Sequence, residues 1–162
     1  MVVLDASTLI LLAKSDLLPL LGQKTGIVIP QQVRQEALAR RELYDARLIE
    51  ETVQAGKIQV SRLSRPDRLR QVQRDFGLEA GEAAALLLAK ERGEPLGTDD
   101  GVAIKAAKVM GVPFFTAIHV LLELVHKRRL DEELALAKLE TLGRLGRYSV
   151  QILEDARRRV KE

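Results

Sequence analysis

The sequence predicts an α/β fold with one central parallel sheet of about four or five strands and helices on both faces. Short apolar runs alternate with stretches of helical periodicity along most of the chain, and this alternation is typical of a parallel sheet covered by helices. The length of 162 residues and the hydrophobic fraction of 46% suit a single domain with one core.

Short apolar runs mark the strands. The first run, Val2–Leu4, ends directly in Asp5, and the run KIQV at 57–60 is predicted to be an edge strand. The predicted strands are, in order, 2–4, 26–30, 57–60, 94–97 and 112–115.

Helices are predicted between these strands because apolar residues recur there at helical spacing. Pro30 and Pro66 suit helix starts, and Gly56 and Gly77 mark helix ends. The predicted helices cover 6–14, 15–23, 31–55, 66–77, 117–127, 131–142 and 150–160. Two further helices are predicted between 77 and 112: one opens on Glu82 and the other opens on the Asp99–Asp100 pair. Residues 1–130 are expected to form the domain that carries the site, and residues 131–162 a helical extension packed on it.

Composition excludes several classes of function. The chain has no cysteine, which excludes disulfides, zinc sites with thiolate ligands and cysteine nucleophiles. No apolar run is long enough to span a bilayer, and the N-terminus lacks the features of a signal peptide, so a cytoplasmic protein without membrane contact is expected. The pI near 9.3 is compatible with a phosphate-backbone partner, although a solvated basic tail explains it equally well.

Acidic residues are predicted to converge at one edge of the sheet. Asp5, Glu82 and the Asp99–Asp100 pair lie at strand-to-helix junctions or helix starts, and Glu36 lies one turn into the helix after the second strand. Each alone could be a helix cap or a surface acid. Together they would repel one another unless a cation sat among them. Oxygen ligands suit Mg²⁺ or Mn²⁺, and such sites hydrolyse phosphate esters.

Four segments together resemble a known family. VVLDASTLILLAK, VIPQQVRQEAL, FGLEAGEAAALLLAKERG and GTDDGVAIKAAKVMGVP occur in this order between Val2 and about Leu130. In these segments the chain resembles PIN domains, and in particular the VapC-like group of small prokaryotic PIN proteins. The resemblance implies a Rossmann-like sheet, acids that bind Mg²⁺ or Mn²⁺, and ribonuclease activity on single-stranded or structured RNA.

The resemblance also implies roles for individual residues. Asp5, Glu82 and Asp100 would hold the metal, with Asp99 as neighbour or substitute, and Glu36 would position or deprotonate the attacking water. Ser7, Thr98 and Lys105 are expected to support the site. The family comparison further implies products with a 5′-phosphate and a 3′-hydroxyl, a homodimer, and a toxin silenced by a small antitoxin.

The sequence departs from the family pattern beside the acids. Gly101 and Ile104 stand where relatives often carry arginine, which leaves Lys105 as the nearby base. Residues 116–119 replace a Gly-Thr-Leu-Gly segment. These losses favour an alternative function, a non-catalytic nucleic-acid- or protein-binding module that keeps the PIN fold, whereas the intact acids argue against it.

Other classes of function fit the sequence less well. A dehalogenase-type phosphatase needs a second Asp where this chain has Ser7. Neither a P-loop nor a glycine-rich dinucleotide turn occurs. His119 and His126 share a helix face, but two histidines without further ligands are more often packing or surface residues.

Overall fold

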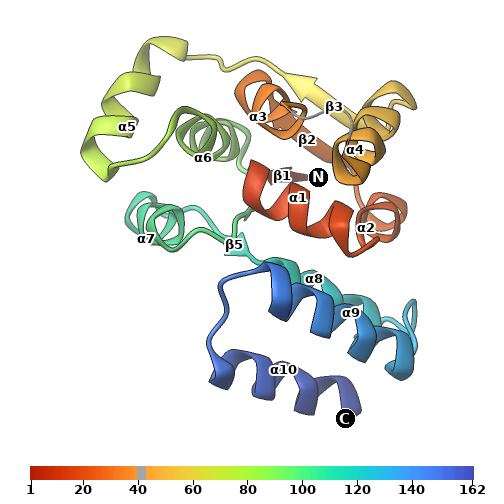
Figure 1. Ribbon diagram of the computed structural model, residues 1–162. Helices are drawn as coiled ribbons and strands as arrows, with labels where there is room; N and C mark the ends of the chain where they lie inside the picture. Colours follow the sequence, from red (N-terminus) through yellow and green to blue (C-terminus); the bar gives the residue numbers. More distant parts are fainter. Residues whose placement is uncertain (40–42) are drawn as a thin grey trace.

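The computed structural model describes residues 1–39 and 43–162 (Figure 1). Its elements are, in order, β1 (Val2–Leu4), α1 (Ala6–Lys14), α2 (Leu18–Lys24), β2 (Ile27–Pro30), α3 (Gln31–Ala37), α4 (Tyr44–Gln54), β3 (Ile58–Ser61), the short 3₁₀ helix η1 (Pro66–Arg68), α5 (Leu69–Phe76), α6 (Ala80–Arg92), β4 (Leu96–Gly97), α7 (Gly101–Met110), β5 (Phe114–Phe115), α8 (Ala117–His126), α9 (Glu132–Leu145) and α10 (Val150–Lys161).

In the described part of the chain, five strands form one sheet in the order β3-β2-β1-β4-β5, and every neighbouring pair is parallel. The predicted fold class is therefore confirmed, and β3 is an edge strand as expected. The central strand β1 pairs with β2 through Val3 and Val28 and with β4 through Leu4 and Gly97. Because all strands run the same way, their carboxyl ends meet at one edge of the sheet.

Helices cover both faces of this sheet. On one face α6 packs across β1, β2 and β4, with α5 and α7 beside it, while α1 packs with α2, α4 and α8. Right-handed crossovers place these two groups of helices on opposite faces, and Figure 1 shows them on either side of β1. The buried apolar residues of the two groups and of the strands form one continuous core.

Several predicted boundaries differ from the observed ones. Helix α6 begins at Ala80 rather than Glu82, because Glu79 is the extended residue that precedes the first turn. Helix α7 begins one residue after Asp100, whose side chain caps it. The predicted helix over 31–55 is represented by α3 and α4, and its residues 40–42 lie outside the described residues.

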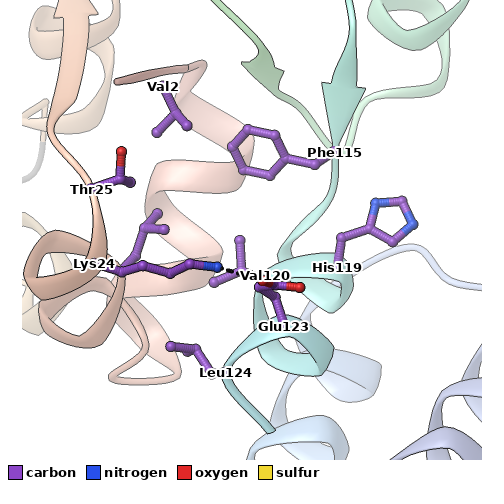
Figure 2. Close-up of a pocket in the computed structure, with 9 residues that line it drawn as sticks. Val2, Lys24, Thr25, Phe115, His119, Val120, Glu123 and Leu124 are labelled. Carbon is purple, nitrogen blue, oxygen red and sulfur yellow. Dashed lines mark hydrogen bonds and ion pairs between the residues drawn. The ribbon is translucent and has the colours of Figure 1, made fainter. Parts of the chain in front are cut away.

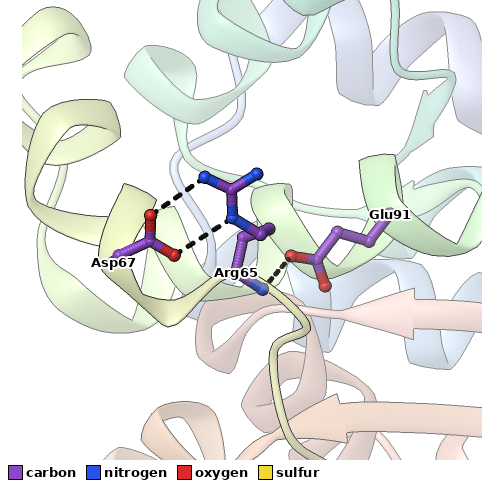
Figure 3. A network of polar contacts seen from close by, with 3 residues as sticks. All are labelled: Arg65, Asp67 and Glu91. Carbon is purple, nitrogen blue, oxygen red and sulfur yellow. Dashed lines mark hydrogen bonds and ion pairs between the residues drawn. The ribbon is translucent and has the colours of Figure 1, made fainter.

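The loop after β3 is tied to α6 by a polar network. The carboxylate of Glu91 accepts hydrogen bonds from the backbone N–H groups of Ser64 at 2.8 Å and Arg65 at 2.9 Å. The guanidinium of Arg65 in turn bonds both oxygens of Asp67 (Figure 3). This network fixes the entry to α5 and with it the chain that leads to the start of α6.

The last three helices form one packed group. Helix α9 packs on α8, and α10 packs on both of them, at the end of the molecule drawn in blue in Figure 1. The Lys138 ammonium of α9 donates to the carbonyl oxygen of Ser15 at 2.7 Å, which joins this group to the end of α1. Among the helices of the described residues, none is long and apolar enough to cross a bilayer.

We expect Gly97→Ala to destabilise the sheet next to the site. A Cβ on Gly97 would lie 2.5 Å from Leu4 Cδ2 and 2.8 Å from Phe115 Cζ, so these two packed side chains would have to shift. Overpacking of this kind typically costs about 1–3 kcal/mol in the free energy of unfolding. Urea denaturation measures it, with Gly22→Ala as control, because nothing lies within 4 Å of a Cβ there. Equal stability of the two variants would contradict the expectation.

Candidate functional site

The predicted acids lie at the carboxyl edge of the sheet. Asp5 directly follows β1, and residues 98–100 directly follow the adjacent strand β4. The backbone N–H of Asp5 donates to Gly97 O at 3.0 Å, so the two strand ends are in register. Glu82 belongs to the first turn of α6, which packs across both strands. Parallel pairing thus places acids that are far apart in the sequence at one crevice.

Asp5 is the buried centre of this edge, with no exposed surface. Its Oδ1 accepts from the Ser7 hydroxyl at 2.7 Å and from the backbone N–H of Thr8 at 3.1 Å, and its Oδ2 accepts from the Thr98 hydroxyl. Burial raises the pKa of Asp5 from 3.8 to about 6, although these hydrogen bonds oppose the rise. The carboxylate is therefore oriented by its partners but poorly compensated in charge.

Two hydroxyls join the loops that follow β1 and β4. Ser7 Oγ donates to Asp5 and accepts from the backbone N–H of Asp99 at 3.2 Å. Thr98 Oγ1 also donates to Asp5 and accepts from the backbone N–H of Asp100 at 3.2 Å. The structure thus places both hydroxyl residues that were predicted to support the site in contact with Asp5.

Glu82 faces the other acids. Burial, together with the charges of Asp100, Asp5 and Glu79, raises its pKa from 4.5 to about 7. Such charge effects require the carboxylates to lie close together. Asp5, Glu82 and Asp100 therefore form one electrostatic group, which agrees with the sequence-based expectation that they converge.

Asp99 and Asp100 have different surroundings. Asp99 Oδ1 accepts from the Thr8 hydroxyl at 2.5 Å and from the backbone N–H of Ala117 at 3.1 Å, and Asp99 Oδ2 accepts from the Tyr148 hydroxyl. Both of its oxygens are thus engaged by the protein. Asp100 uses Oδ2 to cap α7 through Ala103 N–H at 2.9 Å, while its charge acts on Glu82. Asp5 likewise has both oxygens hydrogen-bonded, so what distinguishes Asp100 from Asp99 is the action of its charge on Glu82 rather than free oxygens.

Glu36 lies beside the start of α6 rather than within the group of three. A Cβ on Gly81 would collide with its Oε2, so the Glu36 carboxylate rests against the glycine. Partial burial and the nearby charge of Glu79 raise the pKa of Glu36. The absence of a side chain at Gly81 is what allows this approach between α3 and α6.

We expect Gly81→Ala to displace the Glu36 carboxylate without unfolding the protein. The clash involves the far end of a flexible side chain, and Ala is favoured over Gly inside a helix by about 1 kcal/mol. If Glu36 acts in catalysis, the rate of phosphate-ester hydrolysis should fall about 10- to 100-fold, while the midpoint of thermal unfolding stays level or rises. Gly22→Ala, in the open part of α2, is the control. An unchanged cleavage rate would remove Glu36 from the reaction.

A cleft of about 420 Å³ opens over these acids. Four of the acidic residues line it: Glu79, Glu82, Asp99 and Asp100. Basic side chains line it as well, Lys14 from α1 and Arg147 from the loop between α9 and α10. Lys105, which was expected to support the site, is exposed on α7 and is not part of this lining.

Sequence reasoning missed several residues of this site. Glu79 precedes α6 and acts on both Glu36 and Glu82, and its only signal was its position three residues before Glu82. Tyr148 and Arg147 lie about fifty residues beyond the Asp pair, and nothing local marks them. Burial and the charge of Asp99 raise the pKa of Tyr148, so its hydroxyl stays protonated and donates to Asp99.

His119 has a structural role. Its Nδ1 accepts from the backbone N–H of Thr116 at 3.0 Å, and the Thr116 hydroxyl accepts from the backbone N–H of His119. The two residues form a capping box that starts α8. The segment that departs from the family pattern therefore still builds a well-defined helix start.

The donor set suits a hard divalent cation. Asp5, Glu82 and Asp100 offer only carboxylate oxygen, and the raised pKa values of Asp5 and Glu82 indicate negative charge that a cation would relieve. Within residues 1–39 and 43–162, no three Asp, Glu or His side chains are arranged so that they could hold a metal ion together. Mg²⁺ commonly takes one or two carboxylates and keeps several waters. By donor chemistry these residues therefore suit a hard divalent cation.

A second hollow of about 380 Å³ lies between α2 and α8, apart from the acids (Figure 2). Its lining is mainly apolar, with Val2, Phe115 and Val120 among its residues. Its acid Glu123 pairs with Lys24 at 2.8 Å, and this partner lowers the pKa of Glu123. Glu123 is thus neutralised by a basic partner and its pKa is lowered, whereas the pKa of Glu82 is raised. The candidate site for a cation is therefore the acid cleft and not this hollow.

Comparison with known proteins agrees with this placement. The sequence profile of the family DUF3368, described as PIN domain, matches residues 1–162. None of the curated proteins compared with the chain gives a significant match. The crystal structure of PAE2754 from Pyrobaculum aerophilum is similar with a TM-score of 0.57 and 20% identity, over 77% of this chain and 89% of that chain. At this identity the likeness supports the fold alone. Since the family match spans every residue, the chain belongs to the PIN-domain family, whose members are generally nucleases that use divalent metals.

Proposed function

We propose that this protein is an endoribonuclease that hydrolyses RNA phosphodiester bonds with Mg²⁺ or Mn²⁺ held at the acid cleft. The observation that carries the proposal is the electrostatic group of Asp5, Glu82 and Asp100: burial raises the pKa of Asp5 to about 6, and burial together with the charges of Asp100 and Asp5 raises the pKa of Glu82 to about 7. A site that concentrates uncompensated carboxylates at a sheet edge is suited to bind a cation and, through it, a phosphate.

The chain's own residues have distinct parts in this proposal. Asp5, Glu82 and Asp100 hold the ion, and Ser7 and Thr98 keep the Asp5 carboxylate in one orientation. Glu36, whose carboxylate rests against Gly81 at the start of α6, orients the attacking water and takes its proton, and the raised pKa of Glu36 favours proton uptake. A bound divalent ion would lower the pKa of the attacking water, and its positive charge would stabilise the leaving oxygen.

Cleavage of a labelled single-stranded RNA with Mn²⁺, and with EDTA instead, tests the proposal. We expect metal-dependent cleavage that leaves a 5′-phosphate and a 3′-hydroxyl, and no cleavage with EDTA. Structured RNA and single-stranded DNA, assayed in parallel, define the substrate class. If the protein binds RNA but never cuts it, the chain is instead a non-catalytic binding module with a PIN fold.

The biological setting that we propose rests on the resemblance to VapC-like proteins. In that setting the protein is a cytoplasmic toxin, acts as a homodimer, and is silenced by a small antitoxin that fills the cleft. Induced expression should then stop cell growth, and Asp5→Asn should relieve the arrest. Normal growth at a high level of active protein would contradict the toxin role while leaving the ribonuclease role intact.

A further inference from the structure

The loop between α9 and α10 reaches the acid cleft from the far end of the chain. Gly146 and Arg147 line the cleft together with Glu82 and Asp100. The next residue, Tyr148, donates its hydroxyl to Asp99, which follows β4. The C-terminal helices are therefore connected to the catalytic edge by a direct side-chain bond.

This loop has a defined conformation. The backbone N–H of Gly146 donates to Leu142 O at 2.7 Å, and a Cβ on Gly146 would collide with the Tyr148 ring and lie 2.9 Å from the same carbonyl oxygen. On the other side, the Ser149 hydroxyl caps α10 by accepting from Ile152 N–H at 3.2 Å. Close packing at one end and a helix cap at the other hold Arg147 between two fixed points.

The cleft needs positive charge if a polyanion is to enter it. Four acids and two basic residues line it, so the charge of its lining is mainly negative. Lys14 and Arg147 are the basic residues that line the cleft. Neither forms an ion pair with any residue of 1–39 or 43–162. Both cations are therefore available to an incoming anion.

We propose that Arg147 binds an RNA phosphate next to the scissile bond, with Lys14 as a second contact, and that Tyr148 is a positioning residue that holds Arg147 at the cleft through Asp99. A guanidinium can grip a phosphate with two parallel hydrogen bonds, which gives orientation as well as charge. The α9–α10 loop thus supplies a cation to the cleft, whereas Lys105 and Lys108 of α7 do not line it. This inference rests on the proposed function and names the substrate contacts of the same site.

Binding of RNA in an uncut state tests the inference. The probe is a fluorescein-labelled oligouridylate of about 12 nucleotides, and the protein carries Asp5→Asn so that the RNA stays uncut. Fluorescence anisotropy at several salt concentrations gives the Kd and its salt dependence. Arg147→Ala is compared with Arg144→Ala, since Arg144 is an exposed arginine of α9 that does not line the cleft.

We expect Arg147→Ala to raise the Kd about tenfold and to lower the slope of log Kd against log salt by about one. Arg144→Ala should change the Kd by less than about twofold. The Kd of Arg147→Lys should lie between the Kd values of Arg144→Ala and Arg147→Ala. Tyr148→Phe should raise the Kd about threefold, and it should add nothing once Arg147→Ala is present, because the two residues act through one contact. A merely structural role for Tyr148 would instead give additive effects.

Failure of the inference and failure of the proposed function give different results. If Arg147→Ala and Arg144→Ala have the same effect, or if the parent protein does not bind the RNA, the proposed contact is wrong. If Arg147→Ala weakens RNA binding as expected and Arg144→Ala does not, but the wild-type protein does not cut RNA with Mn²⁺, the contact is supported and the nuclease activity is rejected.

Discussion

Replacement of Asp5 by Asn is expected to reduce RNA cleavage by on the order of a thousandfold, equivalent to about 4 kcal/mol of transition-state stabilisation. The change removes the charge from a carboxylate that has no exposed surface and lies at the centre of the carboxyl edge. It keeps the shape, because the Asn oxygen can accept from Ser7 and Thr8 as Oδ1 does. The Asn amide can donate to the Thr98 hydroxyl, which can turn to accept.

The same variant is expected to be more stable than the wild type when metal is absent. Burial disfavours the charged form of Asp5, whose pKa is raised to about 6, and a neutral Asn avoids that cost. We expect a gain of about 1–2 kcal/mol in the free energy of unfolding near neutral pH. Asp75→Asn makes the same chemical change on the exposed surface of α5 and should alter neither activity nor stability. A loss of activity that comes with unfolding would contradict this account.

Stability of the metal-free protein is expected to fall as the pH rises from about 5 to about 7.5. The pKa of Asp5 rises from 3.8 to about 6 on folding, and that of Glu82 from 4.5 to about 7. The folded state therefore binds these protons more tightly than the unfolded chain. The resulting stabilisation is complete below the unfolded pKa values and is lost as the pH passes the folded ones.

Mn²⁺ is expected to reverse this trend, because the ion binds the deprotonated carboxylates and competes with protons. An ion at about a hundred times its Kd adds about 2.7 kcal/mol to stability, which for a domain of this size raises the thermal midpoint by about 5–10 °C. The shift should be large at about pH 7.5 and small at about pH 5. Thermal unfolding with EDTA and with Mn²⁺ measures it, and Glu82→Gln should abolish most of the shift. A shift that is equal at both pH values would place the ion elsewhere.

The strands themselves and the position of the acids could be predicted because each depends on local pattern. The apolar run of Val2–Leu4 ends at Asp5, and the residues after Leu96–Gly97 include Asp100. Parallel strands bring both of these strand ends to one edge of the sheet. Glu82 could be predicted for the same reason, since it lies in the first turn of the helix that crosses these strands.

Contacts between distant segments could not be predicted from the sequence. Asp99 and Asp100 are adjacent and chemically alike, and only the tertiary structure shows that Tyr148 and Ala117 engage Asp99 while Glu82 faces Asp100. The role of Arg147 depends on how α9 and α10 fold back onto the domain, and no short-range pattern carries that information. Lys105 looked suitable because it is close in sequence to the Asp pair, yet the helix turns it away from the cleft lining.

The most direct test of the account is the anomalous scattering of Mn²⁺ in crystals of the wild-type protein grown at about pH 7.5. The account predicts one or two strong peaks in the cleft in contact with the carboxylates of Asp5, Glu82 and Asp100, and no metal contact from Asp99. Crystals of Asp5→Asn should lose or weaken these peaks. An empty cleft at saturating Mn²⁺, or a peak held by other residues, would contradict the central claim that these three acids form the metal site.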